Sequence, residues 1–378
     1  MKKRIMVLML ALTAALLFSA CEDTKDTYEK GLKAYQEQKY EDALTYFRRA
    51  VSQGQKGAVV KADLALTYRK LSRVDEALAS LNEAYSASPE DPEVLKRIGM
   101  FYELDNDPQT AASYYEQALE KAAGKWTEDS LETQGLLAAL YQKNGLYARA
   151  ISGYNNLITH GYHVPEHLLL AGECYLSEQQ IYASTQYFDL LDQCSDAGSD
   201  HYLKAYQLLM QKKAEKEALT YLNRGIALIE SGKGNCSVGE FYCMAGLYEE
   251  AKPYAEGTGR DACMTRAMIA FNENDLDACE KAVSEALSDD PDDIDAYAFY
   301  LLVKTKKQDE QTVRQLITKI NAGGTDEQKA DALWNQAVMY ENAGKYTEAL
   351  NLLKDYRKNF TLTEEVRNEL RFLSRLED

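Results

Sequence analysis

Proline and phenylalanine are scarce in this sequence. The chain of 378 residues contains six prolines and nine phenylalanines, against 21 glycines and 27 tyrosines. Proline interrupts helices, so a chain with few prolines can hold many uninterrupted ones. The composition favours helical hairpins with aromatic side chains at packing positions over a strand-rich fold.

Positive charge is also in short supply. The chain has 43 Lys and Arg residues against 60 Asp and Glu residues, which gives a formal net charge of -17. Lys2, Lys3 and Arg4 fall in the first twenty residues, so the remainder carries -20. A surface this acidic repels phosphate backbones and anionic lipid headgroups. We therefore expect no nucleic-acid partner, and any membrane contact must come from something other than a basic patch.

The common signatures of catalysis are missing. The sequence has no glycine-rich phosphate loop after a strand, no Ser or Cys nucleophile motif, and no carboxylate pair set apart from the acidic surface. His160, His163 and His167 form an H-x2-H-x3-H pattern. This pattern spans the expected start of a helix and has no Cys or carboxylate at ligand spacing, so a loop between hairpins is the better account. The sequence predicts no enzyme activity, no cofactor and no metal.

A recurring segment organises the chain. Residues 58–91 and 92–125 align with each other without gaps, which places Tyr68 on Tyr102 and Ala77 on Ala111. Small and aromatic residues that recur at a fixed period of this length are typical of stacked helical hairpins. A chain of this length also exceeds what one hydrophobic core supports, so an elongated array fits better than a single globule.

The repeat resembles the tetratricopeptide repeat (TPR). The residues that carry the resemblance are Gly99, Tyr102, Ala111, Tyr115 and Ala118, with Pro89 closing the unit before them. The resemblance implies an all-α fold, an α-α superhelix or TPR solenoid that binds other proteins. About ten units would cover residues 27–362, and the unit near 232–260 is degenerate.

Two parts of this array have features of their own. Pro253, Gly257 and Gly259 are expected to shorten the second helix of the degenerate unit. The segment 363–378 is expected to form a capping helix that begins at Thr363. Its apolar side would consist of Val366, Leu370, Leu373 and Leu376.

The first twenty residues have the pattern of an export signal. A basic start is followed by an apolar run from Ile5 to Phe18, too short to span a bilayer comfortably, and by Ser19 and Ala20. With Cys21 next, the segment resembles the signal peptide of bacterial lipoproteins. That resemblance implies acyl chains such as palmitate on Cys21, a tether over 21–26, and an extracytoplasmic, membrane-anchored protein of the cell envelope. An uncleaved anchor and ordinary secretion are the alternatives.

In the TPR family, the first helix of each unit lines a concave groove. The resemblance implies a partner-binding groove formed by Tyr28, Leu32, Tyr35, Leu66, Arg69, Lys96, Met100, Leu169, Leu203, Met264, Met268, Phe271 and Trp334. Such a wall is mainly apolar, and exposed methionine and aromatic side chains suit a helix or an extended peptide. Packing between neighbouring hairpins is the alternative for each of these residues. A TPR subset clamps a carboxylate with basic and amide side chains, and only Arg97 fits that pattern here.

Six cysteines follow the proposed lipid site: Cys174, Cys194, Cys236, Cys243, Cys263 and Cys279. An even number in an exported chain permits disulfides. Four of the six lie between 236 and 279, where bonds could support the degenerate unit. The alternative is simple packing of buried thiols, because Cys279 occupies a small-residue position of its repeat.

The features together predict a lipid-anchored, extracytoplasmic TPR scaffold that binds a protein or peptide at the bacterial cell envelope. Only the lipid would contact the membrane. A glycan- or small-molecule-binding lipoprotein is the alternative, because Tyr28, Tyr35, Phe271 and Trp334 could stack on sugars. These aromatic residues are dispersed, which argues against one compact pocket.

Overall fold

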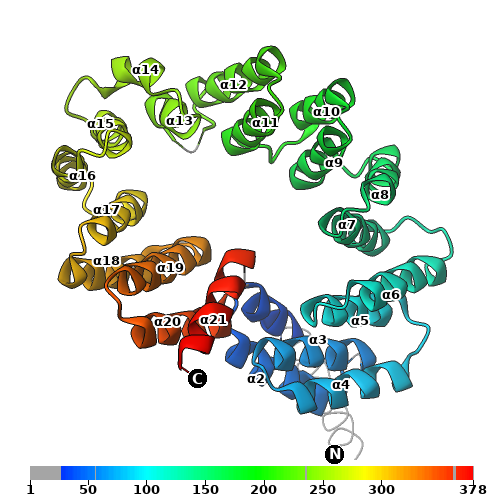
Figure 1. Ribbon diagram of the computed structural model, residues 1–378. Coiled ribbons are helices and arrows are strands. Elements are labelled where there is room, and N and C mark those ends of the chain that lie inside the picture. The colour runs from blue at the N-terminus through cyan, green and yellow to red at the C-terminus, as the bar shows by residue number, and fades with distance from the viewer. Residues whose placement is uncertain (1–26, 56, 235, 361–362, 378) are drawn as a thin grey trace, which may run out of the picture. The chain divides into compact units, whose positions relative to one another are not determined.

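The computed structural model describes residues 27–55, 57–234, 236–360 and 363–377 (Figure 1). Within these ranges the chain forms helices and short connections and no β-strand, so the predicted all-α fold is confirmed. The predicted signal segment and Cys21 lie outside the described residues. No helix in the described part of the chain is long and apolar enough to cross a membrane. The chain divides into two compact units, Met1–Leu146 and Tyr147–Asp378, and each is described by itself.

Unit 1 is a series of antiparallel helical hairpins. After a helix over 27–36 come α2 (Tyr40–Ser52), α3 (Gly57–Lys70), α4 (Val74–Ala87), α5 (Pro92–Leu104), α6 (Pro108–Lys121) and α7 (Glu128–Lys143). The helices α3 and α4 form one hairpin, and α5 and α6 form the next. The first helices of these hairpins, α3 and α5, also pack on each other, as expected for stacked repeats.

Unit 2 continues the same pattern. Its helices are α8 (Tyr147–Thr159), α9 (Pro165–Ser177), α10 (Ile181–Phe188), α11 (Ser199–Gln211), α12 (Glu215–Glu230), α13 (Val238–Met244), α14 (Tyr248–Ala251), α15 (Arg260–Asn272), α16 (Leu276–Asp289), α17 (Ile294–Lys306), α18 (Glu310–Gly323), α19 (Asp326–Asn342), α20 (Tyr346–Asn359) and α21 (Glu364–Glu377). Two short 3-10 helices, η1 (Asp189–Gln193) and η2 (Lys252–Ala255), extend α10 and α14. Hairpins form between α9 and α10, α11 and α12, α15 and α16, α17 and α18, and α19 and α20.

Close packing within a hairpin depends on a glycine and an aromatic ring. A Cβ atom on Gly99 of α5 would lie 2.6 Å from the ring of Tyr115 in α6, and one on Gly172 of α9 would lie 2.1 Å from the ring of Phe188 in α10. Both rings are fully buried. Glycine is therefore required at these two positions for the helices to approach each other.

The turn inside each hairpin also repeats. Gln38, Ser72 and Asn106 each follow the first helix of a hairpin with φ between 58° and 60°, the left-handed conformation that ends a helix. Each of the three lies one sequence period after the previous one, so the period seen in the sequence is also the period of the backbone turn.

The degenerate repeat has the shortened helix that the sequence predicts. The helix α14 contains four residues and passes into the four-residue η2, where Pro253 lies in the first turn. Gly257 follows with φ +112°, a conformation that L side chains rarely adopt. Proline and glycine therefore end this helix early.

The capping helix α21 closes the C-terminal hairpin of unit 2. It packs on α20, and Val366, Leu370 and Leu373 are buried there. Thr363 caps the helix, because its Oγ1 accepts a hydrogen bond from the backbone N–H of Val366 at 3.2 Å. Leu376, which the sequence places on the same apolar side, is instead 52% exposed. The segment is thus a helix that packs on α20, with a shorter apolar face than expected.

Two carboxyl groups meet where the capping helix adjoins α19. Burial, together with the hydrogen bond and charge of Glu369 in α21, raises the pKa of Glu341 in α19 to about 7. Glu369 Oε1 is buried and receives no hydrogen bond from the described residues. A carboxyl group with a raised pKa binds its proton more tightly in the folded state than in the unfolded chain. We therefore expect the docking of α21 to weaken as the pH rises from about 4.5 to about 7, and to change little above that.

The substitution Glu341→Gln should remove this pH dependence, because the amide can donate to Glu369 at every pH. The measurement is hydrogen-exchange protection of the α21 amides at pH 5 and pH 8, corrected for intrinsic exchange. We expect protection to drop between these pH values in the parent chain and to stay level in the variant. Glu365→Gln, an exposed position on the same helix, is the matched control. An equal drop in Glu341→Gln would contradict the explanation.

Candidate functional site

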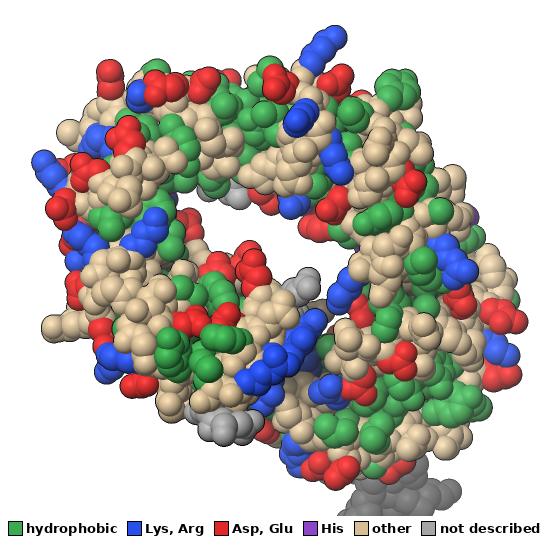
Figure 2. Space-filling model, viewed as in Figure 1, with side chains coloured by type: hydrophobic (Ala, Val, Ile, Leu, Met, Phe, Trp, Pro, Cys, Tyr) green, Lys and Arg blue, Asp and Glu red, His purple; other side chains and the backbone are tan. Residues whose placement is uncertain are grey.

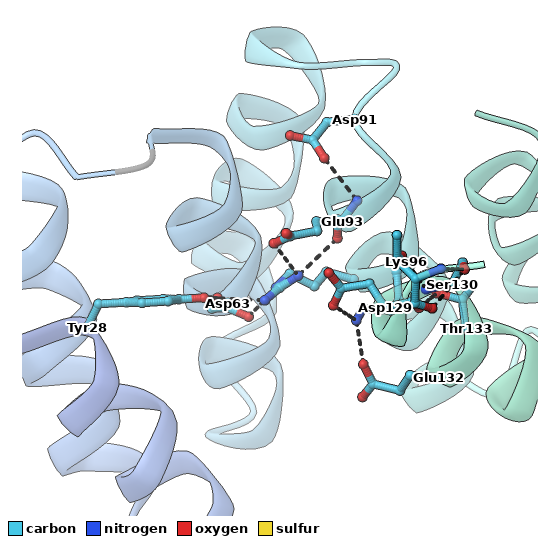
Figure 3. Close-up of polar contacts among 11 residues, drawn as sticks. Tyr28, Asp63, Asp91, Glu93, Lys96, Asp129, Ser130, Glu132 and Thr133 are labelled. Atoms are coloured by element: carbon cyan, nitrogen blue, oxygen red, sulfur yellow. Dashed lines mark hydrogen bonds and ion pairs between the residues drawn. The ribbon is translucent and has the colours of Figure 1, made fainter. Parts of the chain in front are cut away.

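A polar triad, buried at its centre and half-buried at its two ends, joins three successive first helices of unit 1 (Figure 3). It consists of Tyr28 in the helix over 27–36, Asp63 in α3 and Arg97 in α5. The Tyr28 hydroxyl donates to Asp63 Oδ2 at 2.7 Å, and Arg97 Nε donates to Asp63 Oδ1 at 2.6 Å. Residues one period apart occupy equivalent places in stacked repeats, so one network ties three repeats together.

Burial controls the titration of this triad. Burial raises the pKa of the Asp63 carboxyl above its ordinary value, and the charge of Arg97 acts against that rise. Burial and the neighbouring Asp63 raise the pKa of the Tyr28 hydroxyl. The triad is therefore a packed structural element in which each polar group depends on the others.

The hydrogen bonds of Arg97 determine whether it is available for a carboxylate clamp. Besides Asp63, its guanidinium donates to the Tyr28 hydroxyl at 3.3 Å and to the backbone carbonyl of Glu93 at 3.2 Å. These contacts occupy the one residue that matches the clamp pattern. Arg97 therefore stabilises the packing of the first helices, and its guanidinium is already engaged within the fold.

A second contact from α5 is made by Lys96, which reaches the next first helix. Its ammonium lies 2.6 Å from Glu132 Oε2 and 3.3 Å from Asp129 Oδ1, both on α7 (Figure 3). The Lys96 side chain is 7% exposed, whereas both carboxylates are more than half exposed. A buried ammonium needs such partners to offset the loss of water.

A pocket of about 310 Å³ lies beside Lys96, between α5, the end of α6 and the start of α7. We refer to it as the α5–α7 pocket. It is lined by Asp91, Pro92, Glu93, Lys96, Ala118, Lys121, Ala122, Lys125, Thr127, Asp129, Ser130 and Thr133. The pocket combines an apolar floor with charged and hydroxyl groups, the composition common to ligand sites. It is the candidate functional site of unit 1.

The two helix starts that border the pocket are firmly capped. Asp91 accepts a hydrogen bond from the backbone N–H of Glu93 at 2.9 Å at the start of α5. At the start of α7, Thr127 and Ser130 form a capping box with bonds of 2.8 and 3.4 Å. The pocket walls are therefore held by local hydrogen bonds independent of any ligand.

The side chains predicted to line a groove are less exposed than an open apolar wall requires. Four are buried: Leu66 at 2% exposure, Lys96 at 5%, Leu203 at 8% and Met264 at 3%. The others are half-buried: Tyr28, Leu32, Tyr35, Arg69, Met100, Leu169, Met268, Phe271 and Trp334. For the four buried residues, the structure favours the alternative of packing between helices.

Several of the half-buried residues are also in contact with their neighbours. Phe271 of α15 lies against Phe299 of α17 with ring centroids 5.4 Å apart, and Lys306 Nζ lies 4.1 Å from the Phe271 ring. Arg69 of α3 pairs with Asp105. Figure 2 shows acidic and basic side chains interspersed over the visible face of the molecule. Phe271 and Arg69 are thus engaged with neighbouring side chains within the fold.

The remaining sequence candidates for chemistry are used within the fold. All six cysteines of the described chain are free thiols, and Cys174, Cys243, Cys263 and Cys279 are buried. His160 contacts the Asn156 carbonyl through Nδ1 at 2.7 Å, whereas His167 is packed between Tyr154 and Tyr162. No group of three potential metal ligands occurs in the residues that the structure describes.

Sequence reasoning missed the pairing inside the triad and the pocket itself. The signal for the triad was present, because Asp63 and Arg97 carry opposite charges one period apart. The signal for the pocket was an insert near 125–130 that shifts the phase of the repeat. Whether this insert leaves a pocket depends on how α7 packs, which the sequence alone does not specify.

The hairpins, their regular period and the capping helix define a helical-repeat protein. Family models described as tetratricopeptide repeat match residues 62–125 and 331–361. These two segments are therefore tetratricopeptide repeats. Repeats of this family generally serve as interaction modules for other proteins.

Several solved structures are similar to parts of the chain. PilF of Pseudomonas aeruginosa is 17% identical over 59% of this chain and 98% of its own, with a TM-score of 0.44. PilW, a widely conserved type IV pilus biogenesis factor, is 17% identical over 55% of this chain and 94% of its own, with a TM-score of 0.45. The C-terminal part of a TPR protein from Cytophaga hutchinsonii is 15% identical over 71% and 97%, with a TM-score of 0.44. No curated protein matches the sequence. Likenesses this distant say nothing about what the chain binds.

Proposed function

We propose that this protein is a lipid-anchored TPR scaffold that binds other proteins on the extracytoplasmic side of a bacterial cell envelope. The observation that carries the proposal is the combination of a signal-like segment ending at Cys21 with tetratricopeptide repeats at residues 62–125 and 331–361. The anchor supplies location and the repeats supply the interaction surface. We infer a binding role and no catalytic one, because Arg97 and Lys96, the charged residues described above, are engaged in ion pairs within the fold.

The physical basis of the anchor is the burial of acyl chains. Each methylene group buried in a bilayer contributes about 0.8 kcal/mol, so two or three chains hold a protein without a spanning helix. The acidity of the chain adds no attraction to anionic lipids, so the anchor would depend on Cys21 alone.

The glycan alternative has less support. The aromatic residues that it would use are spread over three hairpins, and Trp334 packs against the C-terminal core of unit 2. One face of Phe271 is approached by the Lys306 ammonium. Sugar stacking requires accessible ring faces gathered at one site, and these residues do not offer that arrangement.

The proposal predicts both acylation and contact with a partner. In bacterial cells given an alkyne-tagged palmitate, the full chain should be labelled and should fractionate with membranes. Cys21→Ser should abolish the label and release the chain from the membrane fraction. Cys236→Ser, at a half-buried cysteine of unit 2, is the matched control and should behave like the parent chain.

The same cells can report the binding surface by site-specific photo-crosslinking. A photoreactive residue at Met268, on the first helix α15, should capture a partner protein. The same residue at Tyr182, which is 77% exposed on the second helix α10, should capture little. Labelling that survives Cys21→Ser would overturn the anchor, and equal capture at both positions would overturn the use of the first-helix surface.

A further inference from the structure

The α5–α7 pocket exists because one connection between repeats is longer than its neighbour. The connection between α4 and α5 spans residues 88–91, whereas that between α6 and α7 spans residues 122–127. Adjacent first helices α3 and α5 pack directly on each other. Between α5 and α7, the ion pairs of Lys96 bridge the repeats and leave the pocket beside them.

The floor of the pocket is apolar. Pro92 of α5 and Ala118 and Ala122 at the end of α6 contribute short side chains with no polar group. Such a floor suits the aliphatic stem of a lysine or arginine, which packs on apolar surface while its charged head reaches polar groups. Aromatic side chains do not line the pocket, so stacking of a flat ring is not its natural use.

The carboxylates around the pocket have spare hydrogen-bonding capacity. Asp91 uses one oxygen to cap α5, and its second oxygen accepts no bond from the described residues. One oxygen of Glu93, Oε2, forms an ion pair with Arg97 Nη1 at 3.5 Å. Asp129 meets Lys96 only at 3.3 Å. Ionised carboxylates accept several hydrogen bonds each, so these three can hold an additional cation.

The cations around the pocket, in contrast, are mostly engaged. Lys96 is held by Glu132 at 2.6 Å, and Lys121 by Glu90 at 2.7 Å. Lys125 is the one lysine of the lining without a carboxylate partner among the described residues, and it is exposed on the connection before α7. Together with Glu90 and Glu132, which pair with two of its lysines, the lining carries five carboxylates against three lysines. The local field therefore favours a positive ligand.

We propose that the α5–α7 pocket receives a lysine or arginine side chain of a partner protein, with its stem on Pro92, Ala118 and Ala122 and its charge on Asp91, Glu93 and Asp129. This inference rests on the proposed scaffold function and specifies which side chain one repeat junction recognises. An acidic chain is expected to select basic partners, and this pocket provides a site that binds a single basic side chain.

The probe is Nα-acetyl-arginine amide, titrated into the full isotope-labelled chain in detergent and followed by amide chemical shifts. We expect shifts confined to residues of the pocket, and weaker binding of Nα-acetyl-glutamine amide, which has no charge. Asp129→Asn should weaken arginine binding about three- to fivefold, the effect of losing one partly exposed ion pair. Lys125→Gln should strengthen it, because it removes a like charge.

Matched variants keep the test interpretable. Asp75→Asn makes the same change at the second residue of α4, away from the pocket, and should leave binding unchanged. Asp91→Asn keeps the capping of α5, because asparagine caps as well as aspartate, and should weaken binding as Asp129→Asn does. Binding that strengthens in Asp129→Asn and weakens in Lys125→Gln would mean an anion site and would overturn the proposal.

Failure here is distinguishable from failure of the scaffold. If the pocket residues do not respond to the arginine probe, the pocket assignment is wrong, whatever photo-crosslinking shows. If crosslinking at Met268 recovers a partner equally in the parent chain and in Asp129→Asn, the scaffold function stands without this pocket. Loss of the captured partner in Asp129→Asn alone, with Asp75→Asn normal, would support the proposal.

Discussion

Arg97→Met is expected to lower the free energy of unfolding of unit 1 by about 3–5 kcal/mol at pH 7, the range for removing one partner of a buried ion pair. The side chains of Asp63 and Arg97 are 8% and 13% exposed, so water cannot replace the lost partner. The variant leaves the Asp63 carboxylate inside the protein with only the Tyr28 hydroxyl as a donor. The native pair joins α3 to α5, so the loss should appear as weaker coupling of these repeats.

The size of this effect should depend on pH in a definite direction. Without Arg97, the rise caused by burial of Asp63 is opposed mainly by the Tyr28 hydrogen bond, so the folded pKa of Asp63 rises further above the ordinary value of 3.8. An acid with a raised folded pKa binds more protons when folded, so stability falls as the pH rises above its unfolded pKa. The difference between Arg97→Met and the parent chain should therefore be larger at pH 8 than at pH 5.

The measurement is urea unfolding followed by far-UV circular dichroism, with hydrogen exchange to locate the loss. Repeat arrays can unfold in parts, so exchange of the α3 and α5 amides is the more direct reading. Arg73→Met is the matched control, because Arg73 pairs with Glu76 at the surface and its loss should change the stability little. A double variant, Asp63→Leu with Arg97→Met, should recover much of the stability. Equal losses in Arg97→Met and Arg73→Met would refute the role of the triad.

The repeat architecture was predictable because it depends on residues that are close together in the sequence. The fixed period places Gly99 against Tyr115 and a left-handed residue at each turn, and both can be read as spacing. The shortened helix α14 follows from Pro253 and Gly257 in the same way. Such features depend on residues near one another in the chain, where propensity and sterics decide the outcome.

The exposure of individual groove residues was not predictable in this way. A position on the first helix specifies a direction around that helix but not how far the neighbouring hairpin covers it. Leu66 and Met264 lie on first helices at predicted groove positions, yet they are only 2% and 3% exposed. Lys96 is buried for another reason, since its long side chain extends to Asp129 and Glu132 of the next repeat.

Pairs of opposite charge separated by about one period are a signal that sequence reasoning could use. Asp63 and Arg97 are separated by a full period, and Arg260 and Asp293 by almost the same distance along the chain. In both pairs the structure brings the two side chains into contact between successive repeats. In stacked repeats, equivalent positions become neighbours, so complementary charges there stabilise the junction. This rule leads to a second prediction, in unit 2.

Arg260 joins two helix starts in unit 2. Its Nη1 lies 2.7 Å from Glu240 of α13, and its Nε lies 2.7 Å from Asp293, which caps α17. The carboxylate side chains are only 8% and 7% exposed. Although burial raises it, the hydrogen bond from Arg260 keeps the pKa of Asp293 below its ordinary value. One guanidinium therefore balances two buried negative charges.

Arg260→Met should lower the stability of unit 2 by about 3 kcal/mol at pH 7, because both carboxylates lose their shared partner. The folded pKa of Asp293 is depressed in the parent chain, so its contribution is present above pH 3.8 and is lost as the pH falls below that. The gap between parent and variant should narrow in acid. Urea unfolding at pH 7 and pH 3.5, with hydrogen exchange of α13, α15 and α17, measures both effects.

Arg260→Lys distinguishes charge from geometry at this junction. A lysine ammonium is a point charge without the planar fork of arginine, so it can serve one carboxylate well but not both. We expect it to recover only part of the lost stability. Arg314→Met, at a 65% exposed side chain that pairs with Glu310, is the matched control and should change the stability little. Full recovery by Arg260→Lys would show that net charge, and not a two-armed bridge, holds these repeats together.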